Sequence, residues 1–247
     1  MSHARTAIRC ALAALFAFAG GSALAATPVY VVGTLYKRHE QAPRYALADL
    51  ARVIRAIRPQ VLVLDVTPTE LEKRQVFPGK IEYPGVIFPL LADTNLIAYA
   101  SEPGEPMFGE IVQATIRAFD DFRTTQPALS EALEGHDKAT YAVLMQSWQS
   151  PADAHGGLAE TAIAAHAALQ DALVGPLAAD GRRRWNEHIA DVAARAARDH
   201  AGQRVLVLTG IENRGPVVGL LRAKPGVELV EMEPWLRRHA APTTSGH

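Results

Sequence analysis

The chain is poor in the residues that mark several classes of protein. Cys10 is the only cysteine among 247 residues, which excludes a disulfide framework and a cysteine-based zinc cluster. Basic residues are not in excess, with 25 Lys and Arg against 26 Asp and Glu, which argues against a nucleic-acid binder. No apolar run outside the N-terminus is long enough to span a membrane. With 49% hydrophobic and 21% charged residues, the chain is predicted to fold around a buried core.

The N-terminus has the three parts of a secretory signal peptide. Arg5 and Arg9 give residues 1–9 a positive charge, residues 10–19 are apolar, and Ala23-Leu24-Ala25 forms an A-x-A cleavage site. We therefore predict a signal peptide over residues 1–26, with an uncleaved anchor as the alternative. Cleavage would remove the cysteine, which suits an oxidising periplasm. The expected location is periplasmic or secreted, with no membrane span after cleavage.

Residues 27–240 are predicted to form a single α/β domain. Short β-rich runs occur at residues 29–32, 61–66, 96–100, 204–209 and 227–232. Helical spacing of apolar residues occurs at residues 45–57, 109–124, 127–145, 158–174, 182–200 and 215–221. This order predicts a three-layer fold with a mostly parallel sheet.

The helices at about 106–201 are expected to form a large all-helical insertion that lies over the sheet as a cap. The segments on either side of this insertion are expected to share one sheet, because neither has enough strands to stand alone. The strand at 227–232 is predicted to be an edge strand, because its acidic residues alternate outward. The polar residues 241–247 are predicted to be a disordered tail.

Polar residues follow several of the predicted strands, where parallel sheets carry their binding sites. These are residues 33–39, Asp65, Glu102 and residues 210–214. Asp65 ends an apolar run, and a buried carboxylate needs a partner or a raised pKa. The sequence therefore indicates Asp65 and Glu102 as candidate catalytic carboxylates. An ion pair or a helix cap at Asp65 that only stabilises the fold is the alternative.

Motifs that specify a cofactor are absent from the sequence. It contains no glycine-rich nucleotide loop, no G-x-S-x-G and no H-E-x-x-H. The histidines of the helical segment have no recognisable ligand spacing; they are His136, His155, His166, His188 and His200. No metal site is predicted, and the cofactor is left open.

Five segments together resemble the TraB/Tiki–ChaN–erythromycin esterase-like superfamily. They read VYVVGTLY, IRPQVLVLDV, RRRWNEHIADVAARA, QRVLVLTGIENRGPVVGLL and PGVELVEMEPWL. Members of this superfamily have a G-x-x-H motif after the first strand, a glutamate after the second, an R-N pair on a late helix, and a second G-x-x-H. The resemblance implies an α/β fold with its site at the strand ends.

The sequence departs from this pattern at the residues that carry the family's chemistry. Tyr36 and Asn213 stand where the histidines are expected, Asp65 replaces the glutamate, and Trp185 precedes the matching Asn186. An imidazole can take a proton or bind a metal near neutral pH, whereas a phenol has a pKa near ~10 and an amide does not titrate. The resemblance therefore implies a catalytically reduced member.

Three functional hypotheses follow. The first is a protein that binds a small-molecule ligand at the strand ends, with ligand-binding candidates Tyr36, His39, Asn186, Glu212, Asn213 and Arg214. The second is a hydrolase of ester or peptide bonds that uses Asp65 or Glu102 as general base. The third is a haem-binding protein of the ChaN type, with His155, His166 and Tyr141 as candidate ligands. Association of two copies through the alanine-rich helices stays open.

Overall fold

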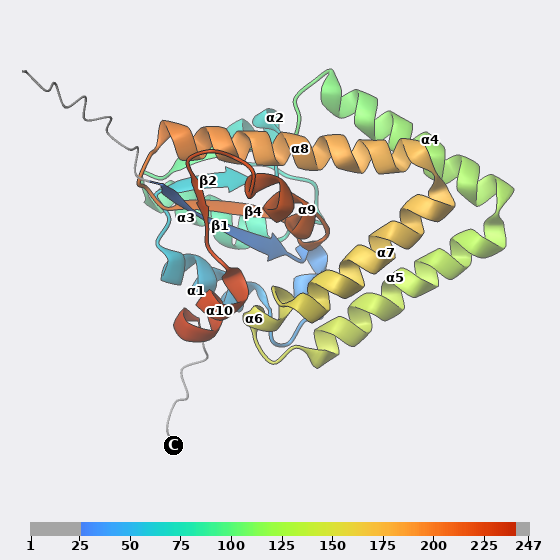
Figure 1. Ribbon diagram of the computed structural model, residues 1–247, viewed down its shortest axis with the longest axis horizontal. Helices are drawn as coiled ribbons and strands as arrows, with labels where there is room; N and C mark the ends of the chain where they lie inside the picture. Colours follow the sequence, from blue (N-terminus) through green and yellow to red (C-terminus); the bar gives the residue numbers. More distant parts are fainter. Residues whose placement is uncertain (1–25, 241–247) are drawn as a thin grey trace, which may run out of the picture.

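Five parallel strands form one sheet in the computed structural model, which describes residues 26–240. The strands are β1 (Thr27–Thr34), β2 (Val61–Leu64), β3 (Ile97–Ala100), β4 (Val205–Gly210) and β5 (Val227–Leu229). Their order across the sheet is β3-β2-β4-β1-β5 (Figure 1). β4 pairs with both β1 and β2, so the segments before and after the helical insertion share one sheet, as predicted.

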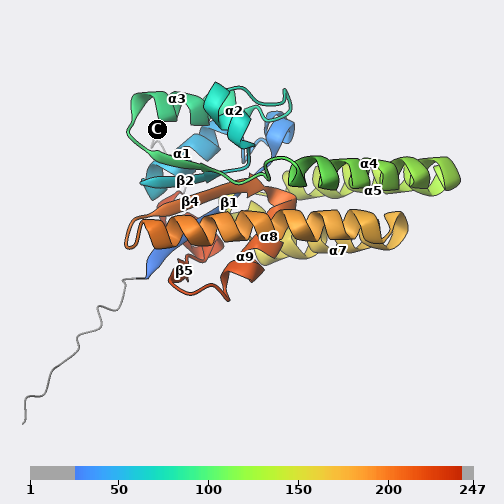
Figure 2. The same cartoon turned by 90° about the horizontal axis from the view of Figure 1, so that it is seen from above.

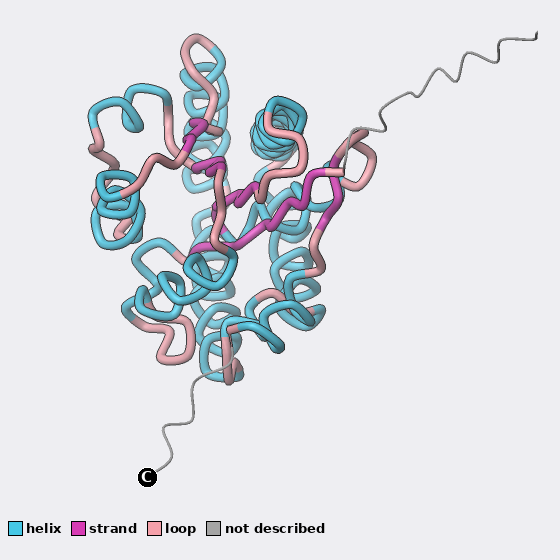
Figure 3. Tube along the Cα trace, turned by 90° about the vertical axis from the view of Figure 1, so that its left-hand side faces the viewer, coloured by secondary structure: helices cyan, strands magenta, loops and turns pink. Residues whose placement is uncertain are grey.

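Alternation of valine and leucine along the strands gives the sheet two different faces. The leucines of β2 and β4 pack with α1 (Leu47–Ile57), α3 (Phe88–Asp93) and α10 (Met232–His239). The valines of the same strands pack against α8 (Pro176–Asp199) and α9 (Ile211–Leu221), where α8 presents mainly alanines. Figure 2 shows the resulting three layers, and Figure 3 shows the twisted strands with helices on both sides. The three-layer α/β prediction is confirmed.

The helices between β3 and β4 form a long projection. They are α4 (Met107–Thr125), α5 (Pro127–Ser147), α6 (Pro151–Ala154), α7 (Gly157–Val174) and α8. The strands point toward α4, α5 and α7, which extend past the carboxyl edge of the sheet together with the start of α8 (Figure 1). We call α4, α5, α7 and the start of α8 the helical arm.

The expected cap over the sheet is only partly correct, because α8 is the one helix of the insertion that lies along a face of the sheet. With 24 residues, α8 is about 36 Å long, whereas the six residues of β4 span about 20 Å. α4 and α7 pack on the part of α8 that overhangs the strands, and α5 packs on α4 and α7.

Two predicted boundaries near the C-terminus are wrong. The last strand ends at Leu229, and Met232 already begins α10; Glu228 is exposed, as expected for an edge strand. The helix predicted over 215–221 instead begins at Ile211, directly after β4, so Pro216 lies inside it. Proline has no amide hydrogen, so the helix tolerates it only by losing one backbone hydrogen bond.

Three short helical segments complete the fold at the carboxyl edge: η1 (Tyr36–Glu40), α2 (Pro68–Lys73) and the π-helical turn η2 (Tyr83–Ile87). The predicted signal peptide up to residue 25 and the predicted tail 241–247 lie outside the described residues. Among the helices that are described, none has the length and apolarity needed to cross a bilayer.

Candidate functional site

Segments that follow three different strands meet at the carboxyl edge of the sheet. Asp65, directly after β2, is buried, and its Oδ2 accepts hydrogen bonds from the phenol of Tyr36 and from the backbone N–H of Gly210 at 3.1 Å. Tyr36 follows β1 and Gly210 ends β4. The structure therefore brings together Tyr36 and Asp65, which the sequence indicated separately.

The backbone around this contact is adapted to it. Tyr36 has a φ of 52°, in the left-handed region that an aromatic residue rarely adopts. The other two non-glycine residues with positive φ among those described, Arg58 and Arg74, are ordinary helix C-caps, whereas Tyr36 begins η1. A side chain on Gly210 would overlap the Tyr36 hydroxyl. A strained residue and an obligatory glycine thus place the phenol on the carboxylate.

Lys80 supplies the positive charge of the site. Its ammonium group pairs with Glu102, after β3, and donates to the backbone carbonyl of Asp65 at 2.7 Å. Burial raises the pKa of Glu102, and the charge of Asp65 adds to this. Burial alone would lower the pKa of Lys80, but the carboxylates of Asp65 and Glu102 outweigh it and raise that pKa. Sequence reasoning missed Lys80, because it lies in a loop with no recognisable pattern.

A third carboxyl group lies in the same polar interior. Glu82 is fully buried, neither of its carboxylate oxygens has a hydrogen-bond partner among the described residues, and burial raises its pKa to about 7. The hydroxyls of Tyr83 and Thr209 and the Oδ1 of Asp65 also lack protein partners there. Asp65, Glu82 and Glu102 all raise the pKa of Tyr83, after burial itself, so these groups share one environment. No signal in the sequence distinguished Glu82.

A cavity of about 410 Å³ lies beside this cluster. Tyr36 and Lys80 form part of its wall, together with Leu35, Lys37, Arg38, Phe77 and Gly79. The side chain of Phe77 is 70% exposed, and Lys37 is exposed as well. The wall combines basic groups with apolar surface, which suits a ligand that has an anionic group and an apolar body.

Arg38 connects this cavity to the helical arm. Its guanidinium pairs with Glu212 at 3.0 Å and with Asp137 at 3.1 Å, and it lies 3.9 Å from the centre of the Tyr141 ring. Tyr141 in turn donates to Glu212 at 2.8 Å. Glu212, a predicted ligand-binding residue, is therefore engaged by protein groups at the rim of the site.

His39 and Arg214 are held by the fold. The Nε2 of His39 accepts from the N–H of Leu35 at 3.1 Å, and its Nδ1–H donates to the carbonyl of Tyr45 at 2.7 Å. Arg214 is buried, donates to the carbonyl of Val31 at 3.1 Å and pairs with Glu160. Both predicted ligand-binding residues thus have structural partners.

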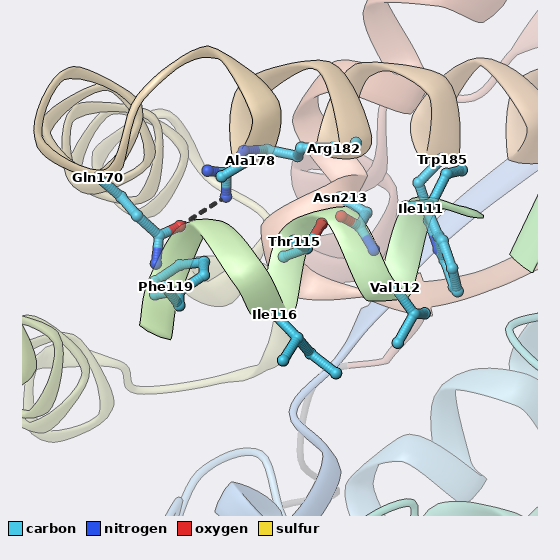
Figure 4. Close-up of a pocket in the computed structure, with 11 residues that line it drawn as sticks. Ile111, Val112, Thr115, Ile116, Phe119, Gln170, Ala178, Arg182, Trp185 and Asn213 are labelled. Carbon is cyan, nitrogen blue, oxygen red and sulfur yellow. Dashed lines mark hydrogen bonds between the residues drawn. The ribbon is translucent and has the colours of Figure 1, made fainter. Parts of the chain in front are cut away.

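Asn213 and Asn186 lie elsewhere. Asn213 lines a cavity of about 310 Å³ between α4 and α8, which also contains Trp185 and Arg182 (Figure 4). Asn186 is buried in α8, and its Oδ1 has no partner among the described residues. Tyr36 does not line this cavity, so the two motif positions Tyr36 and Asn213 face different cavities.

The three haem-ligand candidates do not form one pocket. The Nε2 of His155 accepts from the N–H of Gly33 at 3.0 Å, and its Nδ1–H donates to the carbonyl of Pro151 at 2.7 Å. Burial, followed by the charge of Arg214, lowers the pKa of His155 to about 3. Both of its ring nitrogens are thus occupied, and Tyr141 is bound to Glu212. His155 and Tyr141 therefore do not fit as axial ligands of haem, and His166 lines a separate cavity that neither of them lines.

No family model, curated protein or solved structure matches the chain. Within residues 26–240, no group of three or more His, Cys, Asp or Glu side chains has metal-binding geometry. The function is therefore best argued from the site at the carboxyl edge.

Proposed function

We propose that this is a secreted, periplasmic protein of the TraB/Tiki type, catalytically reduced, that binds a small ligand at the carboxyl ends of its strands. The observation that carries the proposal is the convergence of Tyr36, Asp65 and Lys80 beside the 410 Å³ cavity. Tyr36 and Asp65 are also the positions that correspond to the family's first histidine and its glutamate. Their hydrogen bond supports the proposed kinship.

The ligand of this cavity is a small anion with an apolar or aromatic body. Lys37 supplies the positive charge of the wall, because the charges of Arg38 and Lys80 are paired with carboxylates. Phe77 gives the wall exposed apolar surface. Ligand pockets generally combine apolar lining with a few polar groups, as this wall does.

The absence of a titratable imidazole at this cavity supports binding as its function. Burial and the neighbouring carboxylates raise the pKa of Tyr36 well above its ordinary value, so the phenol stays protonated and acts as a donor. The nearest histidine in sequence, His39, is saturated by backbone and hydroxyl partners.

Fluorescence titration with anilinonaphthalene sulfonate, an anionic aromatic probe, tests the proposal. Lys37→Glu is expected to weaken binding about tenfold, equivalent to about 1.4 kcal/mol, because an attractive charge becomes repulsive. Lys224→Glu is the matched control, since Lys224 lies just before β5, at the opposite edge of the sheet. Equal binding by the wild type and Lys37→Glu, or equal losses in both variants, would contradict the proposed site.

The proposed secretion is tested at the N-terminus. Protein recovered from the periplasmic fraction of a Gram-negative host is expected to begin at Ala26 or Thr27. Recovery of a chain that still begins at Met1 from the cytoplasmic fraction alone would refute secretion.

A hydrolase is the second candidate, favoured by the raised pKa of Glu102. Burial raises the pKa of Glu102 above its ordinary value, which suits a carboxyl group to proton transfer near neutral pH, and Asp65 keeps one oxygen without a protein partner among the described residues. Ester and peptide substrates would be screened with the wild type, Asp65→Asn and Glu102→Gln. We expect any genuine activity to fall at least about a hundredfold in one variant; unchanged turnover in both removes this candidate.

A further inference from the structure

Two histidines of the helical arm face each other across neighbouring helices. His136 on α5 and His166 on α7 have their Nδ1 atoms 2.9 Å apart, and their ring planes differ by only 16°. The ring centroids are 5.1 Å apart. This distance is close to the 2.9 Å between the two nitrogens plus the distance from the centre of each ring to its Nδ1 atom. The rings therefore lie edge to edge, with the two Nδ1 atoms pointing at each other almost in line.

A carboxylate lies beside one of these rings. The Nε2 of His166 lies 3.2 Å from Oδ1 of Asp137, and the other oxygen of Asp137 is held by Arg38 at 3.1 Å. A carboxylate at Nε2 retains the hydrogen on that nitrogen and leaves the Nδ1 lone pair directed at His136. Carboxylates near the outer nitrogen of an imidazole are common partners of metal-bound histidines.

We propose that His136 and His166 form a two-histidine site for copper(I) that links α5 to α7. Imidazole nitrogens suit copper, and a filled d shell imposes no geometry, so the ion accepts two ligands in line. Neither histidine lines the proposed ligand cavity at the carboxyl edge, which is connected to this site only through Arg38 and Asp137.

The geometry requires only a small adjustment for a metal to enter. Metal–imidazole bonds of about 2 Å require the two nitrogens to move apart to about 4 Å. His136 is exposed at the surface, so rotation of its side chain can provide this movement without displacing either helix.

Each Nδ1 of the pair has only the other Nδ1 as a hydrogen-bond partner among the described residues, so both nitrogens are available to a metal. By contrast, His39 and His155 are bonded through both ring nitrogens and offer none.

Competition for copper(I) against the chelator bicinchoninate, without oxygen, tests the site on the full chain. The wild type is expected to withdraw one more equivalent of copper than His136→Gln or His166→Gln. His188→Gln is the matched control, since His188 is a half-buried histidine of α8, and it is expected to behave as the wild type. Binding by other residues is common to all four proteins and cancels in the difference.

Thermal unfolding with and without copper(I) supplies the second measurement. The wild type is expected to melt at a higher temperature with the metal, and His136→Gln is expected to show no such shift. Because His136 is exposed, this variant decides the question even where His166→Gln fails to fold. Equal copper uptake by the wild type and His136→Gln would show that the pair is only a hydrogen bond between imidazoles. If the pair binds one equivalent of zinc in preference to copper(I), the assignment of copper(I) is wrong.

Discussion

Replacing Gly210 with alanine tests whether packing places the Tyr36 phenol on Asp65. The backbone of Gly210 has a φ of −52° and a ψ of 142°, which alanine adopts without strain, so the cost comes from contacts alone. The added methyl group would overlap the Tyr36 hydroxyl and lie 3.0 Å from two ring carbons of the same residue. Relief requires the phenol to leave Asp65.

The expected loss combines two effects. Losing a hydrogen bond to a charged acceptor costs about 1.5–3 kcal/mol, and overpacking costs about 1–3 kcal/mol. We therefore expect Gly210→Ala to lower the free energy of unfolding by about 3 kcal/mol. Gly219→Ala is the matched control, because no atom lies within 4 Å of its added methyl group and alanine favours a helix by about 0.5–1 kcal/mol.

A double-mutant cycle with Tyr36→Phe separates the contact from general disruption. Without the hydroxyl, the nearest atom to the added methyl group is 3.0 Å away instead of overlapping. The cost of Gly210→Ala should then fall by at least about 1 kcal/mol, measured by urea unfolding of all four proteins. If the losses of the two single variants add up to the loss of the double variant within about 0.5 kcal/mol, the reasoning is refuted.

Three further predictions concern buried ionisable groups. Lys80→Met leaves Glu102 without its partner and should lower the free energy of unfolding, measured in urea, by about 3–5 kcal/mol. The double variant Lys80→Met/Glu102→Leu should recover most of this loss. Equal stability of the single and double variants would contradict this prediction. The pKa of Glu82 is raised from 4.5 to about 7, so the folded state holds a proton that the unfolded state loses. The free energy of unfolding should therefore fall by on the order of 3 kcal/mol as the pH rises from 4.5 to 7, and Glu82→Gln should remove this dependence on pH. Parallel plots of stability against pH for the wild type and Glu82→Gln would contradict this prediction. The pKa of His155 is lowered from 6.5 to about 3, so the unfolded state binds the proton first and stability should fall as the pH drops below 6.5. His155→Gln should be less sensitive to acid, and an unchanged acid transition would count against this account.

The sequence predicted those features of the fold that depend on local pattern. Runs such as Val61–Leu64, apolar on both faces, indicated buried parallel strands, and the structure confirms them. The position of β4 between β1 and β2 depends on pairing between distant segments, which periodicity does not encode. In the site, Asp65, Glu102 and Tyr36 were found because they follow strands. Lys80 and Glu82 were missed because a loop with no regular spacing carries them to the same place.

Residues 212–214 do not present their side chains to one site, although Glu212 and Arg214 both line a cavity of about 430 Å³ at the start of α9. As a loop after β4, residues 210–214 would present their side chains to one site. Because α9 begins at Ile211, successive side chains instead turn by about 100° around the helix axis. Glu212 therefore points to Arg38 and Tyr141, Asn213 to the cavity between α4 and α8, and Arg214 to Val31 and Glu160.

Of these three residues, only Glu212 reaches the carboxyl-edge cavity, and it does so through Arg38. The groups that meet directly at this edge, Tyr36, Asp65 and Lys80, come from three separate segments. Each of them enters from the end of a strand or from a loop, where one side chain can be aimed without constraining its neighbours. A site of this kind is assembled by the sheet topology, so no contiguous motif in the sequence could have contained it.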